Sequence, residues 1–468
     1  MKLFDTLSRT KQTLKPLNDK HVTMYSCGLT VYSHPHIGNW VGYIYWDVLV
    51  RTLEAEGFTV ERTQNYTDVG HLTSDDDSGE DKIEKQAKAE GSTAWEIAQK
   101  FITIADNEAY KELRLKMPAH LARATDYITE QIHFVETLET KGYTYIIPNE
   151  GVYFDTAKLS DYGKLAQLDI NGLEAGARVA ISGKRNITDF ALWKFSPKTA
   201  KRDMEWDSPW GKGFPGWHLE CSVIAQSTLG NQIDIHTGGI DHIPVHHTNE
   251  IAQTEALTDK PFAQMWLHNN HLKVNGAKMS KSLGNIYTLQ DITKHGFSID
   301  AFKILVLSKH YRTEGNFTWD ILSAAENRLK GLCEAAALQW QPIATVEHNY
   351  DFKKWVHAIQ SQLADDLSTP AALATLNEQL EQVKQNLIHP SETSAYREYL
   401  SNVDNLFGLQ LSATPDIPED AAELLQARHN ARTNQNWKQA DELRDALANK
   451  NIAVRDTPAG QVWYWFSW

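Results

Sequence analysis

The chain has 468 residues, an apolar fraction of 41% and a formal net charge of −14. This length allows roughly two to four domains, no apolar run is long enough to span a membrane, and the first residues lack the apolar centre of a secretory signal. The acidic balance argues against indiscriminate nucleic-acid binding, although a locally basic face can still bind a specific RNA, and three cysteines without a disulfide framework favour a reduced, cytoplasmic setting.

Residues 1–120 have the pattern of one half of a nucleotide-binding α/β fold. Residues 24–26 have the composition of the end of a buried strand, which we expect the Cys-Gly pair at Cys27 to break. A helical apolar pattern then runs to a stop at Gly57, and residues 58–63 predict a second strand. The pattern therefore indicates a first strand, loop and helix followed by another strand.

The tetrapeptide HIGN, from His36 to Asn39, stands before that helical pattern. A helix N-terminus offers unpaired N–H groups and a positive dipole end, which suit a phosphate. His36 and Asn39 would then be donors to that phosphate. The same short pattern also fits an ordinary capped helix beside a solvated loop.

The next segments change texture. The acidic run at 74–82 is typical of a solvated loop, and residues 83–145 predict helices with one break. Residues 121–210 predict a connective insertion between two halves of the sheet, with strands at 151–155 and 189–194.

Residues 211–262 resume the α/β pattern. A short helical run follows the WHLEC motif at Trp217, and residues 233–236 predict a strand that ends in glycines. A helix comes next, and it carries His246 and Glu250 one turn apart. These two side chains share a helix face and can therefore hold one ion.

Residues 263–315 predict a strand at 266–268 and then a glycine-flanked loop with the sequence KMSKS. Lys278 and Lys281 of this loop fit a role in neutralising phosphate charge, or belong to an ordinary surface loop. Residues 316–410 are helical by periodicity.

Residues 419–468 predict a small last module, with helices at 419–433 and 436–449 and a strand near 452–455. Basic and aromatic residues are interleaved in it, which suits unstacked RNA bases. The alternative is a packed aromatic tail with exposed arginines.

The motifs HIGN, WHLEC, DIHTGGID, HHTNE and KMSKS stand in this order on one chain. Together they resemble the class I aminoacyl-tRNA synthetases, specifically the cysteinyl-tRNA synthetases, over nearly the whole length. The resemblance implies an α/β Rossmann-type catalytic domain with a parallel sheet and an insertion, a helical bundle and a small C-terminal α/β module. It assigns 1–120 and 211–262 to the two catalytic halves, 121–210 to the insertion, 263–315 to the KMSKS loop and stem-contact region, 316–410 to a tRNA-binding bundle and 419–468 to an anticodon-binding module.

The family holds one zinc ion in its cysteine pocket. On the matching positions the ligands would be Cys27, Cys221, His246 and Glu250. The residue types agree with zinc chemistry, although His236, His242 and His247 are rival ligands and the cysteines by spacing alone could be two buried apolar residues. Zinc favours a deprotonated thiol, so it would select cysteine over serine far better than an apolar pocket can.

The resemblance implies a cytoplasmic ligase that activates L-cysteine with ATP and Mg²⁺ to cysteinyl-adenylate and transfers it to the 3′ end of tRNA(Cys). Geometry and charge stabilisation suffice for this chemistry, and we expect a monomer. The matching catalytic positions are His36, Asn39, Lys278 and Lys281. The ATP contacts would add Gly28, Gly38 and Asp241. The cysteine pocket would add Thr30, Trp217 and His236. The candidate anticodon contacts are Trp437, Arg444, Asp456 and Trp463.

The chain departs from the common family pattern at Leu29, Ser33 and Thr248, where proline, aspartate and glutamate are usual. The run GHLTSDDDSGED also replaces a shorter TDVDDK run. Two other functions fit parts of the chain. A cysteine ligase of mycothiol synthesis, which joins cysteine to glucosaminyl-inositol, would share the catalytic half, and a non-catalytic zinc-bearing RNA-binding protein would share the metal site and the tail.

Overall fold

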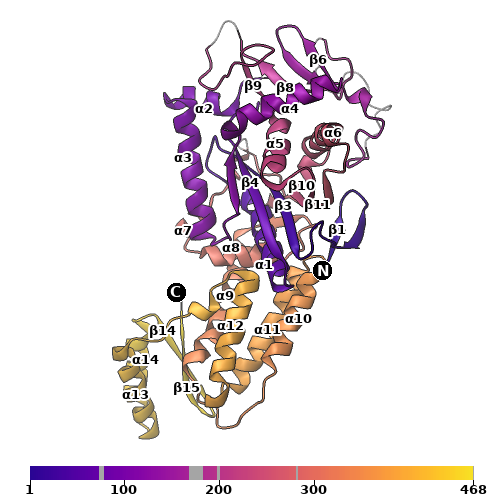
Figure 1. The fold of residues 1–468 in the computed structure, drawn as a ribbon. Coiled ribbons are helices and arrows are strands. Elements are labelled where there is room, and N and C mark those ends of the chain that lie inside the picture. Colours follow the sequence, from indigo (N-terminus) through magenta and orange to yellow (C-terminus); the bar gives the residue numbers. More distant parts are fainter. Residues whose placement is uncertain (73–78, 168–182, 198–200, 281–282, 467–468) are drawn as a thin grey trace. The chain divides into compact units, whose positions relative to one another are not determined.

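The computed structural model describes residues 1–72, 79–167, 183–197, 201–280 and 283–466 (Figure 1). The chain forms two compact units. Unit 1 comprises residues 1–273, 277–289 and 311–315, and unit 2 comprises residues 274–276, 290–310 and 316–468. The six segment boundaries expected from the sequence stay predictions.

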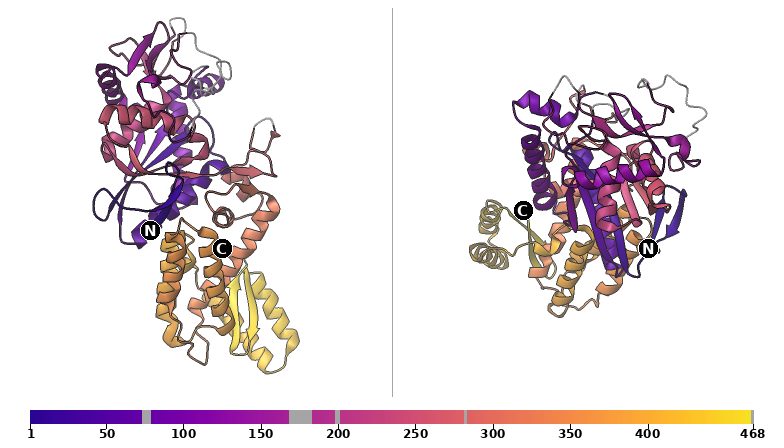
Figure 2. Two further views of the ribbon diagram at one scale, coloured as in Figure 1. Left: turned by 90° about the vertical axis from the view of Figure 1, so that its right-hand side faces the viewer. Right: turned by 45° about the horizontal axis from the view of Figure 1, so that its top comes forward.

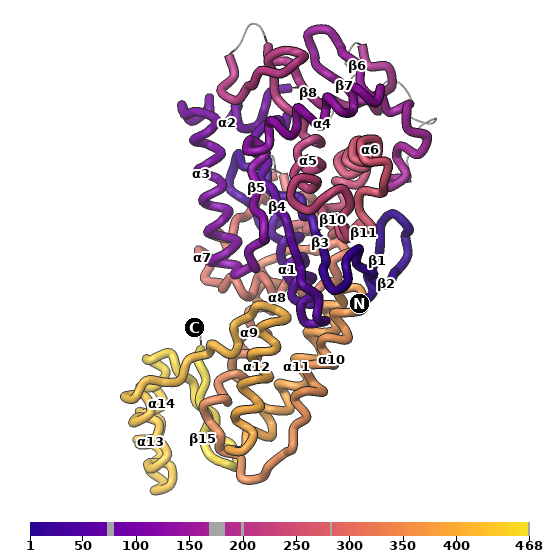
Figure 3. The backbone as a smooth tube through the Cα atoms, viewed as in Figure 1, coloured from indigo at the N-terminus to yellow at the C-terminus, as the bar shows by residue number. Residues whose placement is uncertain are grey.

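A five-stranded parallel sheet forms the centre of unit 1, with the order β11-β10-β3-β4-β5 (Figures 2 and 3). The bounds are β3 (His21–Thr30), β4 (Thr59–Thr67), β5 (His120–Arg123), β10 (Ile233–Gly239) and β11 (Ala263–Asn269). Most residues of β10 and β11 are buried, because a parallel sheet is covered on both faces, and polar residues of β10 such as Asp234 and His236 are buried with the apolar ones. The predicted parallel sheet is confirmed.

Three helices beside this sheet carry the motifs: α1 (Ile37–Ala55), α5 (Trp217–Leu229) and α6 (His246–Thr258). Helix α1 begins inside HIGN, α5 begins at the tryptophan of WHLEC, and α6 begins at the first histidine of HHTNE. Each motif therefore lies where a strand or loop turns into a helix.

Two details of the sheet differ from the sequence prediction. Cys27 and Gly28 do not end β3, because a bulge between Ser26 and Leu29 lets the strand continue to Thr30. Only glycine fits the bulge, since a Cβ on Gly28 would lie 1.4 Å from the Asn65 carbonyl oxygen. Edge strand β5 was missed within a stretch predicted to be helical.

A four-stranded antiparallel sheet with the order β6-β7-β8-β9 lies between residues 144 and 215. Its strands are β6 (Thr144–Ile147), β7 (Gly151–Phe154), β8 (Phe190–Phe195) and β9 (Gly213–Pro215). The strands predicted at 151–155 and 189–194 are confirmed as β7 and β8. The other elements that precede this sheet in the chain are the hairpin β1 (Lys2–Asp5) and β2 (Thr10–Thr13), and the helices α2 (Lys82–Glu90), α3 (Ala94–Asp106) and α4 (Ile128–Thr140).

The chain from residue 289 onward is mainly helical, as predicted. Its helices are α7 (Leu289–Lys294), α8 (Ile299–Leu307), α9 (Trp319–Ala337), α10 (Phe352–Ala364), α11 (Thr369–Asn386) and α12 (Thr393–Phe407). Short strands β12 (Leu272–Val274) and β13 (Gly315–Phe317) accompany the start of this region. The last module packs α13 (Glu419–Thr433) and α14 (Trp437–Ala448) with an antiparallel pair, β14 (Ile452–Thr457) and β15 (Gly460–Trp465). Among the described helices, none has the length and apolar character that a membrane crossing requires.

Candidate functional site

A cavity of about 830 Å³ opens in unit 1 where the parallel strands end. The ends of β3, β4 and β10 all contribute to its wall, as expected for an α/β sheet that binds a ligand at the carboxyl edge of its strands. Most of the predicted site residues line it, namely Cys27, Gly28, Thr30, His36, Gly38, Asn39, Trp217, Cys221, Asp241, His246 and Lys278. Lys281 lies outside the described residues.

Two thiols, an imidazole and a carboxylate meet at one side of the cavity. The donor atoms of Cys27, Cys221, His246 and Glu250 all lie within 4.8 Å of one another. The two sulfur atoms are 4.0 Å apart, and Nε2 of His246 lies 3.1 Å from Oε1 of Glu250. Ligands of a tetrahedral zinc are separated by about 3.4–3.8 Å, so this donor set fits zinc with small adjustments.

The imidazole of His246 is oriented by a second histidine. Its Nδ1 lies 3.0 Å from Nδ1 of His218, which is buried. If His246 donates its Nδ1 proton to His218, the Nε2 lone pair faces Glu250 and can bind a metal. This arrangement of a ligand held through its other ring nitrogen is usual in zinc sites.

A second donor set overlaps the first and consists of Cys27, His236, His247 and Glu250. Nε2 of His236 lies 2.8 Å from Oε2 of Glu250, and Nε2 of His247 lies 3.3 Å from Sγ of Cys27. Of this set only Cys27 lines the cavity, whereas Cys27, Cys221 and His246 of the first set all do. The first set is therefore the better candidate for a metal that a substrate must reach. His236 contacts Glu250 from behind the cavity wall.

The electrostatics of the two thiols differ. Burial alone would raise the pKa of Cys27, but its hydrogen bond with Cys221 and the neighbouring His247 lower that pKa well below its usual value. Burial and the adjacent Cys27 raise the pKa of Cys221. Of the two adjacent thiols, Cys27 is therefore the more acidic, and a lowered thiol pKa suits a metal ligand.

The HIGN turn caps α1. Nδ1 of His36 accepts from the Asn39 backbone N–H at 3.2 Å, while Oδ1 of Asn39 accepts from the His36 N–H at 2.9 Å. Burial lowers the pKa of His36, so the ring is neutral and its proton lies on Nε2. The Asn39 amide N–H groups and the His36 Nε2–H are thereby left as donors. The predicted helix cap is confirmed, and the same turn lines the cavity, while phosphate binding there stays a prediction.

The cavity wall includes several side chains that the sequence prediction did not name, among them Thr67 at the end of β4, His71 just after it, and Lys82 at the start of α2. Thr67 donates to the Glu220 carboxylate. His71 stacks on Trp217 with ring centroids 4.1 Å apart. The position of Thr67 at a parallel strand end was the signal available for it, whereas His71 belongs to the unusual GHLTSDDDSGED run.

Two family models match the chain. The model described as the class I (C) tRNA synthetase catalytic domain covers residues 13–327, and the cysteinyl-tRNA ligase anticodon-binding domain covers residues 414–463. The curated protein Cysteine--tRNA ligase 1 of Burkholderia lata is 44% identical over 467 residues, which span 98% of this chain and 96% of that protein. The chain belongs to the cysteine–tRNA ligase family.

Other comparisons agree. Cysteine--tRNA ligase of Treponema denticola is 38% identical across 99% of both chains. Among solved structures, a Mycobacterium tuberculosis methionyl-tRNA synthetase with methionyl-adenylate has a TM-score of 0.58 at 13% identity, covering 88% of this chain and 95% of that one. A complex of an Agrobacterium radiobacter LeuRS with tRNA has a TM-score of 0.60 at 12% identity, covering 87% of this chain and 88% of that one. These structures support the class I fold of this cysteine–tRNA ligase family member.

The last module matches the family's anticodon-binding domain, and within it the four candidate RNA contacts differ in how exposed they are. Trp437 is 56% exposed, and Arg444 is exposed too. Trp463 is only 3% exposed and packs in the core of the module, so it cannot stack on a base, and that prediction is wrong. Asp456 forms a two-bonded ion pair with Arg428 at 2.9 Å, so its carboxylate is engaged within the module.

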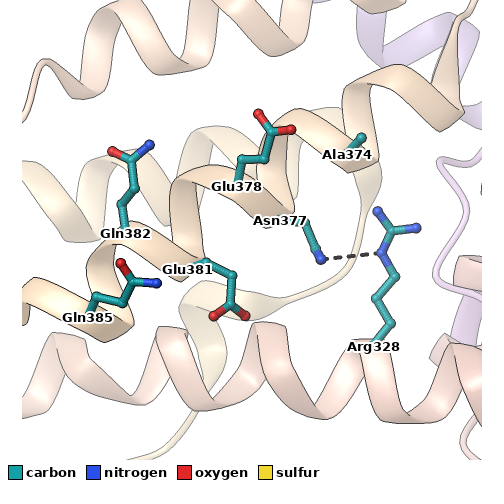
Figure 4. Close-up of a pocket in the computed structure, with 7 residues that line it drawn as sticks. All are labelled: Arg328, Ala374, Asn377, Glu378, Glu381, Gln382 and Gln385. Carbon is teal, nitrogen blue, oxygen red and sulfur yellow. Dashed lines mark hydrogen bonds between the residues drawn. The ribbon is translucent and has the colours of Figure 1, made fainter.

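A second cavity, of about 590 Å³, lies in unit 2 between α9 and α11 (Figure 4). Arg328 reaches Asn377 there at 3.3 Å, and Glu378 and Glu381 stand on the same wall. Its acidic and amide lining differs from the sulfur- and histidine-rich wall of the unit 1 cavity. Of these two cavities, the one in unit 1 is lined by most of the predicted zinc, cysteine and ATP residues.

Proposed function

We propose that this member of the cysteine–tRNA ligase family activates L-cysteine with ATP and transfers it to tRNA(Cys). The observation that carries the proposal is the convergence of two thiols, an imidazole and a carboxylate beside a capped helix N-terminus in one cavity. The first group suits a thiol-selecting metal and the second suits a triphosphate. Both are needed to join an amino acid recognised by its sulfur to a nucleotide.

Cys27, Cys221, His246 and Glu250 would hold the zinc ion, since their donor atoms have the right types and separations. Bound there, zinc would favour the thiolate of the substrate cysteine over the alcohol of serine. The protein's own part is to hold these donors at the cavity wall, with His218 orienting His246 and His236 orienting Glu250. Trp217 and Thr30 complete the wall of the amino-acid pocket.

The nucleotide would lie against the start of α1. His36 and Asn39 present neutral N–H donors, and Gly38 lets Met279 of the KMSKS loop approach this turn, since a Cβ there would lie 2.1 Å from Cε of Met279. Asp241 is exposed on the cavity wall after β10 and can accept from ribose hydroxyls. Lys278, with Lys281 and Mg²⁺, would neutralise the phosphates as the carboxylate of cysteine attacks the α-phosphate and pyrophosphate leaves.

The second step transfers the cysteinyl group from AMP to a hydroxyl of the terminal adenosine of the tRNA, which breaks the mixed anhydride and forms an ester. No side-chain nucleophile is needed, because positioning and charge stabilisation suffice. The C-terminal module would bind the anticodon through Trp437 and Arg444, which are exposed. The centroid of the Trp437 ring lies 5.4 Å from the Arg432 guanidinium, and this flat aromatic ring is a suitable platform for a base.

The decisive experiment is cysteine-dependent ATP–pyrophosphate exchange, followed by charging of a tRNA(Cys) transcript. We expect exchange with cysteine, far weaker exchange with serine, and one zinc ion per chain by metal analysis. Transfer of cysteine to glucosaminyl-inositol instead of tRNA would assign the chain to mycothiol synthesis. Zinc and RNA binding without exchange would show a non-catalytic protein.

A further inference from the structure

A chain of hydrogen bonds in the wall of the unit 1 cavity connects Lys82 through His71 to Thr30. Nζ of Lys82 lies 2.6 Å from Nε2 of His71, and Nδ1 of His71 lies 2.6 Å from Oγ1 of Thr30. All three residues line the cavity. His71 is 9% exposed, and each of its two ring nitrogens has one of these two residues as its hydrogen-bond partner.

The backbone holds this histidine in place. The Lys82 N–H donates to the His71 carbonyl at 3.0 Å, and the Gly70 N–H donates to Oδ2 of Asp81 at 2.9 Å. Asp81 is in turn paired with Arg202 at 2.9 Å. The two ends of the GHLTSDDDSGED run are thereby tied together, and the run delivers one imidazole to the cavity.

The chemistry of the partners fixes the direction of the bridge. A lysine ammonium only donates, so Nε2 of His71 accepts, and the ring proton lies on Nδ1 and is donated to Oγ1 of Thr30. Burial, with the charge of Lys82, lowers the pKa of His71 well below its usual value, which keeps the ring neutral as this arrangement requires. The hydroxyl proton of Thr30 is therefore turned away from His71.

The same ring also supports the metal side of the pocket. His71 lies parallel to Trp217, with an interplanar angle of 9° and ring centroids 4.1 Å apart. Trp217 stacks in turn on His246, with centroids 4.5 Å apart. One side chain thus holds both the hydroxyl of Thr30 and the indole that borders the donor set.

We propose that His71 is a positioning residue for the amino-acid substrate, which sets the Thr30 hydroxyl as a donor to the substrate carboxylate and holds Trp217 against the pocket. The proposal rests on the proposed function. Thr30, Trp217 and two of the candidate ligands, Cys27 and Cys221, line the same cavity, and the stack from His71 through Trp217 to His246 joins the Thr30 side of that cavity to the donor set. A substrate whose thiol is directed to the donor set therefore lies in the cavity that Thr30 also lines.

The test is a double-mutant cycle in the ATP–pyrophosphate exchange assay. Thr30→Val removes the hydroxyl at constant shape, and His71→Phe keeps a flat ring for Trp217 but removes both nitrogens. Each variant should raise the KM for cysteine about 10- to 100-fold, as expected for a lost hydrogen bond to a charged group, with the KM for ATP and the metal content close to wild type. Because the residues act in series, the double variant should be no worse than the single variants.

Conservative variants and substrate fragments sharpen the result. His71→Asn keeps a donor near the position of Nδ1, and Thr30→Ser keeps the hydroxyl, so both should recover most of the lost affinity. As inhibitors of exchange, 3-mercaptopropionate should weaken in Thr30→Val, whereas cysteamine, which lacks the carboxylate, should not.

Additive effects in the cycle, an unchanged KM for cysteine, or equal weakening of cysteamine would overturn the assignment of His71. Absence of cysteine-dependent exchange in the wild-type protein would instead overturn the proposed function. The two failures are distinguishable because the first requires an active wild type.

Discussion

Replacing Cys221 with serine tests the donor set most directly. The change substitutes a hydroxyl for one of two thiols whose sulfur atoms lie 4.0 Å apart. A serine hydroxyl has a much higher pKa and a harder oxygen, so it does not replace a zinc thiolate. Cys221 lies on α5, where it lines the cavity and is only 1% exposed, so the substitution leaves the outer surface of the protein unaltered.

The expected loss of zinc affinity can be judged from the number of ligands that remain. Loss of a group that only orients a ligand typically costs about 10–100-fold in metal affinity. Loss of one of four direct ligands should cost more, so we expect zinc affinity to fall more than about 100-fold, or roughly 3 kcal/mol. The KM for cysteine should rise in parallel, since the thiol of the substrate loses its metal partner.

Cys333→Ser is the matched control. Cys333 is 4% exposed within α9 of unit 2, so the same buried thiol-to-hydroxyl change is made away from the donor set. Metal affinity by competition with a chelator, exchange kinetics and thermal unfolding should be measured for both. We expect similar losses of stability and a loss of metal only in Cys221→Ser. Equal zinc retention in the two variants would refute the assignment of Cys221 as a ligand.

Three further predictions concern the fold, the pH dependence and the RNA. Gly28→Ala should destabilise unit 1 by about 3 kcal/mol or more, because its Cβ would strike the Asn65 carbonyl, whereas Gly331→Ala, whose Cβ meets only the end of a lysine at 3.7 Å, should stabilise α9 by about 0.5–1 kcal/mol in denaturant titrations. Burial raises the pKa of Asp68 to about 6, above its value of 3.8 when unfolded, so its contribution to stability is lost as the pH rises from about 4 to 6. Between pH 4 and pH 7 the free energy of unfolding of Asp68→Asn should therefore rise by about 3 kcal/mol relative to that of the wild type. A difference in unfolding free energy that does not change with pH would contradict this. Trp437→Ala should weaken tRNA binding about 10-fold in a filter-binding assay and leave cysteine-dependent exchange unaltered, and equal loss of both would show a structural role instead.

The central sheet and much of the site were predictable because they follow from local patterns. The strands predicted at 233–236 and 266–268 lie within β10 and β11. Helical spacing alone placed His246 and Glu250 on one face, and their donor atoms lie 3.1 Å apart. In both cases the relevant neighbours are close in sequence or repeat with a simple period.

What could not be predicted depends on contacts between distant segments. The bulge at Gly28 exists because β4 passes close to it, which no property of β3 alone reveals. Whether an aromatic residue of the tail is exposed depends on packing, and the core of the module buries Trp463 while Trp437 remains outside. His71 acquires its role from Trp217 and Thr30, which lie on α5 and β3.

The choice of metal ligands shows the same dependence on three-dimensional position. Spacing alone left four histidines as rivals, and the fold does bring several of them together: His236 from the end of β10, with His246 and His247 from the start of α6. Position relative to the cavity separates them, because a ligand set that a substrate must reach has to face it. His246 and His242 both line the cavity, whereas His236 and His247 lie behind it against Glu250 and His268, and His242 belongs to neither of the two donor sets found among the described residues. His236 and His247 contact Glu250 and Cys27 from behind the cavity wall, so the proposed metal site would account for much of the excess of histidines.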